Sequence, residues 1–171
     1  MESWSFERLL TQLDEVLGFC ANILSLREAV ARSRFTTHHK PLIERLCVAV
    51  RTKDDTETQA VFSSNPVGSS MAITEVEEFS QLLPLFRLAE AKALRPKVER
   101  ALSGPAIPMD EDQNSSKGRN ALFELVMAAK LKHAGLEPIL GEHPDLACQW
   151  SASMRRPSPV KANVVASDQQ A

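Results

Sequence analysis

Two carboxylates in the C-terminal third of the chain are spaced so that they could hold a metal ion together. Glu124 lies in an apolar stretch with helical spacing, and Asp145 follows Pro144, where a strand is expected to begin. Hard cations such as Mg²⁺ bind carboxylate oxygens, and a bound metal can activate water and offset the charge that builds on a phosphodiester. The pair therefore predicts a Mg²⁺ site, provided that the helix packs against the strand.

The order of motifs around these carboxylates resembles the core of the PD-(D/E)XK nuclease-like superfamily. The predicted helix contains the motif Arg-Asn-x-x-Phe-Glu, whose last residue is Glu124. A glycine, a strand and a Pro-Asp pair follow this helix, and all of these features lie within residues 117–150. The resemblance implies that Glu124 is the helix carboxylate and that Asp145 is the metal-binding aspartate. It also implies an acid-x-lysine motif on the next strand, which would complete the site.

No acid-x-lysine motif follows Asp145 in the sequence. Lys161 is preceded two positions earlier by Pro159, and Asp168 is followed two positions later by Gln170. We therefore expect a degenerate or truncated nuclease-like protein without catalytic activity, in which a truncated or frame-shifted C-terminus would account for the loss. If the site were active, its reaction would be Mg²⁺-dependent phosphodiester hydrolysis.

Basic side chains around the predicted helix suggest weak contact with nucleic acid, through Lys117, Arg119, Lys130 and Lys132. A solvated basic helix face is the simpler interpretation of the same residues. Glu124 could likewise be a solvent-facing helix residue, and Asp145 could simply start a turn. These alternatives stay open from the sequence alone.

The four histidines are expected to have no catalytic role. His38 and His39 precede a proline and are interpreted as a loop pair. His133 and His143 lie near the predicted site and could serve as ligands or acid–base groups, but surface or turn positions are the simpler expectation.

The composition is that of a soluble globular protein. Of 171 residues, 43% are hydrophobic and 25% charged, and a formal net charge of −2 provides no overall attraction to nucleic acid or membrane. The N-terminus lacks a secretory pattern, and no apolar run approaches the roughly 20 residues that span a bilayer. We expect a cytoplasmic protein with no membrane partner, whose three cysteines are reduced thiols at positions Cys20, Cys47 and Cys148.

Apolar spacing predicts a helical region over residues 1–102. The first helix has an apolar stripe from Phe6 to Leu24, and the second begins at Pro41 after a break over Ser33–Thr37. Residues 63–70 are expected to be a loop because of their composition.

Further helices are expected between this loop and the glycine at position 104. Thr74 and Glu77 match a capping box that would open a third helix. Pro84 and Pro96 should kink or divide that helix, and Gly104 should end it.

The remainder of the chain is expected to contain strands and disordered segments as well as a helix. Residues 103–118 form a linker, a helix over 119–134 ends at Gly135, short strands cover 136–140 and 145–150, and residues 151–171 form a disordered tail. The predicted fold class is therefore α+β, predominantly α, with a helical N-terminal region followed by a small α/β remnant of one helix and two or three short strands.

The alternative function is that of a helical protein-interaction or scaffold protein with no enzymatic role. Such a protein would bind a partner protein through the helical region.

Overall fold

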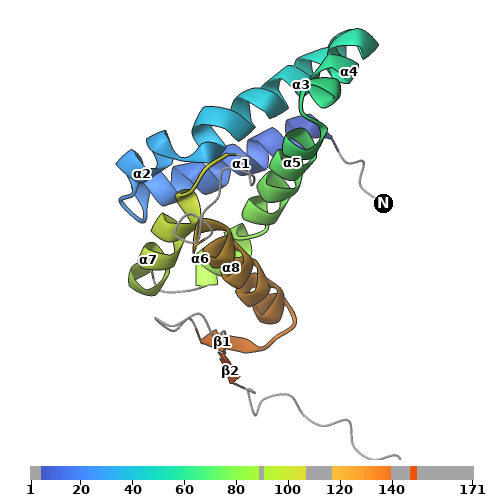
Figure 1. Cartoon of the computed structure of the whole chain (residues 1–171). Helices are drawn as coiled ribbons and strands as arrows, with labels where there is room; N and C mark the ends of the chain where they lie inside the picture. Colours follow the sequence, from blue (N-terminus) through green and yellow to red (C-terminus); the bar gives the residue numbers. More distant parts are fainter. Residues whose placement is uncertain (1–4, 89–90, 107–116, 140–146, 150–171) are drawn as a thin grey trace, which may run out of the picture.

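Helices dominate the computed structural model, which describes residues 5–88, 91–106, 117–139 and 147–149 (Figure 1). This confirms the prediction of a predominantly helical protein. None of the described helices combines the length and the apolar character needed to cross a lipid bilayer. In chain order the elements are α1 (Phe6–Asn22), α2 (Arg27–Arg32), the π-helix η1 (Phe35–His39), α3 (Lys40–Thr52), α4 (Asp55–Ser64), α5 (Pro66–Ser80), α6 (Leu83–Leu88), α7 (Ala91–Leu102), α8 (Lys117–His133), β1 (Glu137–Ile139) and β2 (Ala147–Gln149).

The helices are arranged around one apolar core. Helix α1 packs against α3 and α5, while α7 and α8 pack against each other and the two strands lie beyond the end of α8 (Figure 1). The core contains Leu13 of α1, Phe79 of α5 and Leu125 of α8. Helices on either side of the predicted linker at residues 103–118 therefore share the same buried interior.

The first helix forms for local reasons that are visible in the sequence. Ser5 caps it by accepting a hydrogen bond from the Arg8 backbone N–H at 3.1 Å, which satisfies one of the unpaired donors of the first turn. Its buried face consists of residues three and four positions apart, namely Leu9, Leu13, Val16, Leu17 and Cys20. The predicted first helix is confirmed.

The predicted break at Ser33–Thr37 is much shorter in the structure. Ser33 alone has an extended backbone, with ψ of 151°, and its Oγ accepts a hydrogen bond from the Thr36 N–H at 3.3 Å. The helix resumes at once as η1, where the wider π turn directs Phe35 and His39 into the interior. The interpretation of His38 and His39 as a loop pair is therefore wrong, because a single residue with a side-chain cap is enough to interrupt the helix.

The predicted loop at residues 63–70 is also wrong, because α5 begins inside it. Asn65 caps this helix by accepting from the Gly68 N–H at 2.9 Å, and Pro66 occupies the first turn. Thr74 therefore lies in the helix interior, where its hydroxyl donates to the Ser70 carbonyl at 3.1 Å. It does not open a helix, since the Asn-Pro start lies about two and a half turns earlier.

The two prolines differ in their effect. Helix α5 ends at Ser80 and Pro84 lies in the first turn of α6, whereas α7 continues through Pro96. Gly104 has φ of 101° and follows the end of α7. This left-handed conformation suits glycine and ends the helix as predicted.

The C-terminal part of the described chain consists of α8 and a β-hairpin. Gly135, with φ of 80°, follows α8, and β1 pairs antiparallel with β2, with Pro138 opposite Cys148. Helix α8 begins two residues before the expected range of 119–134, inside the predicted linker, and β1 and β2 are shorter than the strands expected over 136–140 and 145–150. Asp145, His143, Lys161, most of the predicted linker and the whole predicted tail lie outside the described residues.

Candidate functional site

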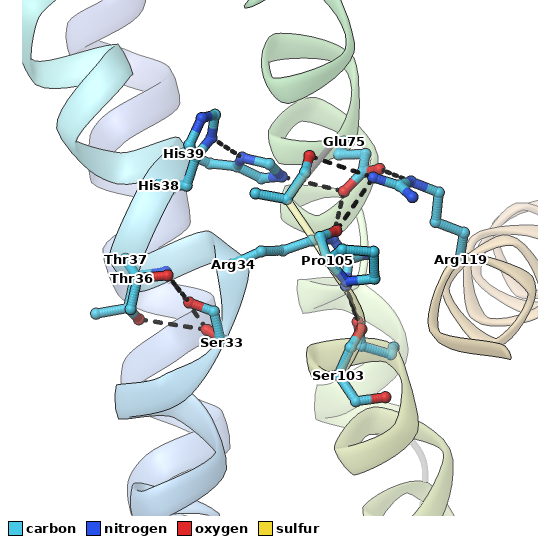
Figure 2. Close-up of polar contacts among 12 residues, drawn as sticks. Ser33, Arg34, Thr36, Thr37, His38, His39, Glu75, Ser103, Pro105 and Arg119 are labelled. Carbon is cyan, nitrogen blue, oxygen red and sulfur yellow. Dashed lines mark hydrogen bonds and ion pairs between the residues drawn. The ribbon is translucent and has the colours of Figure 1, made fainter. Parts of the chain in front are cut away.

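The main polar cluster in the described part of the chain surrounds Glu75 on α5 (Figure 2). The side chain of Glu75 is only 7% exposed. Its Oε2 accepts from Arg34 Nε at 2.6 Å and contacts His39 Nε2 at 3.1 Å, while its Oε1 accepts from Arg119 Nε. The buried carboxylate on α5 thus contacts Arg34, which precedes η1, His39 at the end of η1, and Arg119 of α8.

The two arginines also bind the chain that follows α7. Arg34 Nη1 donates to the carbonyls of Ala101 at 2.9 Å and Ser103 at 2.6 Å. Arg119 Nη2 donates to the carbonyls of Pro105 and Ala106, both at 3.3 Å. The last carbonyls of a helix have no partner within it and form the negative end of its dipole, so a guanidinium is well suited to this position.

Aromatic packing aligns the same elements. Phe35 of η1 stacks on Phe79 of α5 with ring centroids 4.3 Å apart, and Phe79 lies one turn after Glu75. Arg34 Cζ lies 4.7 Å from the centroid of the Phe35 ring, within the range of a cation–π contact. The apolar stack and the charged cluster therefore fix the position of η1 on α5 together.

The ionisation of the cluster follows from its contacts. Burial opposes the charge on Glu75, but the hydrogen bond from His39 and the contacts with Arg34 and Arg119 outweigh it and lower the pKa of Glu75 from 4.5 to about 2. Burial lowers the pKa of His39, against the opposing effect of Glu75. At neutral pH the cluster therefore holds two cations, one carboxylate and a neutral imidazole, and Arg34 Nη2 is buried with no hydrogen-bond partner among the described residues.

Glu124, the predicted metal ligand, lies in a second polar contact. Its carboxylate forms an ion pair with Lys97 of α7, and the two side chains are 15% and 9% exposed. Asp145 lies outside the described residues, so the structure does not bring the two predicted ligands together. In the described part of the chain no group of three or more His, Cys, Asp or Glu side chains is placed to share a metal ion.

The residues predicted to contact nucleic acid are in different environments. Lys117 and Lys130 are exposed and Lys132 is half-buried. Arg119 turns inward to Glu75 and is only 17% exposed. Two of the four basic side chains therefore lie fully on the surface.

The central residues of the cluster were not predicted from the sequence. Glu75 occupies the same helical stripe as Ala72, Val76 and Phe79, which are all buried. An acidic residue at a core position of an apolar helical pattern is a detectable signal, since buried carboxylates need charged or hydrogen-bonding partners. No comparable indication in the sequence pointed to Arg34, because a break in the helix was expected over Ser33–Thr37.

Comparison with known proteins returned no match, whether against family models, curated proteins or solved structures. The chemistry of the site therefore has to be judged from its own geometry. Glu75, Arg34 and Arg119 neutralise one another and bind backbone carbonyls, and Glu124 neutralises Lys97. This arrangement is suited to holding helices together.

Proposed function

We propose that this chain is a helical interaction protein with no catalytic role, and that a partner protein binds on the outer face of α8. The observation behind this proposal is the contrast between two adjacent residues of that helix. Glu124 turns inward to Lys97, whereas the neighbouring Phe123 is 62% exposed. An exposed phenylalanine favours a contact with another molecule where further apolar side chains extend the same surface.

The outer face of α8 has further apolar character. Met127, one turn after Phe123, is half-buried, whereas Leu122 and Leu125 on the inner face of the helix are fully buried. A pocket of about 330 Å³ lined by Gln81, Ala129, Lys130 and His133 lies beside the C-terminal half of the same helix. This surface could accept an apolar side chain from a partner.

The charges on α8 favour an acidic partner. Lys117 and Lys130 are exposed near its two ends, and its only acid, Glu124, is already paired with Lys97. An amphipathic helix with leucines on one face and acidic residues beside them would match both the apolar and the basic groups.

A designed peptide of this composition provides the test. Titration of the ¹⁵N-labelled protein should shift amide signals of residues 120–131, and the shifts should be lost in Phe123→Ser. Val67→Ser is the matched control, because Val67 is 60% exposed on α5, and it should leave binding unchanged. Shifts on another surface, or equal loss in both variants, would contradict the proposal.

A nuclease-derived ancestry is the second candidate. It is favoured by the order of α8, the antiparallel pair β1–β2 and the position of Pro144-Asp145 just before β2. On this hypothesis the α/β remnant is a degenerate PD-(D/E)XK-like core, with Glu124 and Asp145 as former Mg²⁺ ligands and weak nucleic-acid contact through Lys117 and Lys130.

Metal titration separates the two candidates. A bound metal stabilises the folded state by mass action, so Mg²⁺ or Mn²⁺ would raise the Tm if a site survives, and Asp145→Ala would abolish the rise. The interaction proposal predicts no metal-dependent rise and no cleavage of plasmid DNA. Duplex DNA that binds more tightly than the acidic peptide would favour the second candidate.

A further inference from the structure

Two adjacent histidines connect the buried cluster with the surface. His38 is half-buried and His39 is 1% exposed, and their Nδ1 atoms lie 3.1 Å apart (Figure 2). On its other side His39 contacts Glu75 through Nε2. A chain of polar contacts therefore runs from His38 through His39 to the carboxylate that binds Arg34 and Arg119.

The protons in this chain can be assigned from its chemistry. An ionised carboxylate can only accept, so the contact with Glu75 places a hydrogen on His39 Nε2. In a neutral imidazole the other nitrogen is then a bare acceptor, and His38 Nδ1–H must be the donor to it. Two Nδ1 atoms at this distance share one proton. A second proton on His39 therefore meets the Nδ1–H of His38, and the contact is kept only if His38 moves its own proton to Nε2.

We propose that His38 and His39 form an acid-sensitive latch, in which protonation of His39 removes the hydrogen bond that it accepts from His38 and loosens the cluster that fastens residues 101–106 and α8 to η1 and α5. The latch depends on the Nδ1–Nδ1 contact and on the burial of His39. It is independent of the function proposed above.

The surroundings of His39 explain why an additional charge is poorly tolerated. The charged or titratable groups that face it are Glu75 of α5, Arg34 before η1, and His38, while Arg119 of α8 reaches it through the shared carboxylate. The Phe35 ring meets the imidazole edge-on, with centroids 5.2 Å apart. A protonated His39 would place a third cation beside one carboxylate in an apolar setting.

The cluster identifies the segments that would loosen. Glu75 binds the two guanidinium groups that donate to the carbonyls of Ala101, Ser103, Pro105 and Ala106. A charged His39 repels Arg34 and competes with it for Glu75 Oε2, which both side chains contact. The start of α8 and the end of α7 should therefore lose their protection before the distant α1–α3 contact does.

The pH range of the latch differs from that of Glu75. Above 6.5, the ordinary pKa of histidine, His39 is neutral in both the folded and the unfolded chain. Below 6.5 the unfolded chain takes up the proton first, because burial lowers the folded pKa, so stability falls as the pH decreases. Protonation of Glu75 contributes only below its ordinary pKa of 4.5, so the effect of His39 is separated from that of Glu75.

The test compares the full chain with His39→Gln, whose amide can still donate to Glu75 but does not titrate. Between pH 7.5 and 5.0 the parent Tm should fall, because burial lowers the pKa of His39 in the folded chain. Protection factors of amides 117–122 should fall several-fold. Both changes should be absent in His39→Gln and retained in the control His133→Gln, since His133 is exposed.

Equal pH dependence in the parent and in His39→Gln would overturn the latch. If His39→Gln does not fold, ¹⁵N NMR of the parent imidazoles decides instead. The latch requires a neutral, Nε2-protonated His39 at pH 7.5 that gains its second proton together with the loss of protection at residues 117–122. An Nδ1-protonated or already charged His39 at pH 7.5 would refute it.

Discussion

Glu75 on α5 and Arg119 on α8 form an ion pair between residues 44 positions apart, in the interior of the helical assembly. Arg34 binds the other oxygen of the same carboxylate at 2.6 Å. The carboxylate thus balances two guanidinium groups that have little access to water. Four consequences of this packing can be measured.

Removal of the Glu75 charge should destabilise the protein strongly. Glu75→Gln leaves two buried arginines without their counter-ion, and breaking such a pair costs about 3–5 kcal/mol. Urea unfolding at pH 7 should show a loss of about 3 kcal/mol. The control Glu77→Gln changes an exposed residue of the same helix and should alter stability by less than about 0.5 kcal/mol. Equal effects of the two variants would show that the cluster is energetically unimportant.

The same carboxylate should make stability depend on pH in acid. Because the pKa of Glu75 is lowered from 4.5 to about 2 on folding, its contribution is complete above pH 4.5 and is lost as the pH falls toward 2. The lowering corresponds to about 3 kcal/mol. The difference in unfolding free energy between the parent and Glu75→Gln should shrink over this range, and a constant difference would contradict the assignment.

Two glycines in helices should respond oppositely to alanine. A Cβ at Gly118 would lie 2.2 Å from the Ser103 carbonyl oxygen, whereas a Cβ at Gly18 of α1 has nothing within 4 Å. Gly118→Ala should therefore cost about 1–3 kcal/mol, through displacement of α8 from the end of α7. Gly18→Ala should stabilise by about 0.5–1 kcal/mol, because alanine favours the helix. Thermal unfolding of both variants measures these changes in stability. If Gly118→Ala were as stable as the parent, α8 would not approach Ser103 closely.

Lys97 and Glu124 should be energetically coupled. Each side chain is largely buried in their ion pair, so Lys97→Met or Glu124→Gln alone leaves a poorly solvated charge. A double-mutant cycle should give a coupling energy of about 1–2 kcal/mol. Lys130→Met, which changes an exposed lysine, should show no coupling to Glu124. Additive effects of Lys97→Met and Glu124→Gln would indicate that Glu124 is free for another role.

Much of the local structure is determined by the sequence itself. The apolar stripe of α1, its cap at Ser5, the glycine stop at Gly135 and the two short strands depend on residues close together in the chain. Helix periodicity, capping and left-handed glycine positions act over a few residues, so they can be recognised without knowledge of the fold. The start of α5 was also encoded locally, by Asn65 and Pro66, although the surrounding serines and glycine indicated a loop.

Only the tertiary structure decided which charged residues meet. Arg34, Glu75 and Arg119 come from segments more than 40 residues apart, and no local pattern pairs an acid on one helix with a base on another. Glu124 illustrates the same limit, since its motif predicted a metal ligand while packing of α8 on α7 placed Lys97 beside it. Helix formation depends on neighbours in the sequence, whereas the partner of a buried charge depends on how whole helices pack, and that is the physical reason for the difference.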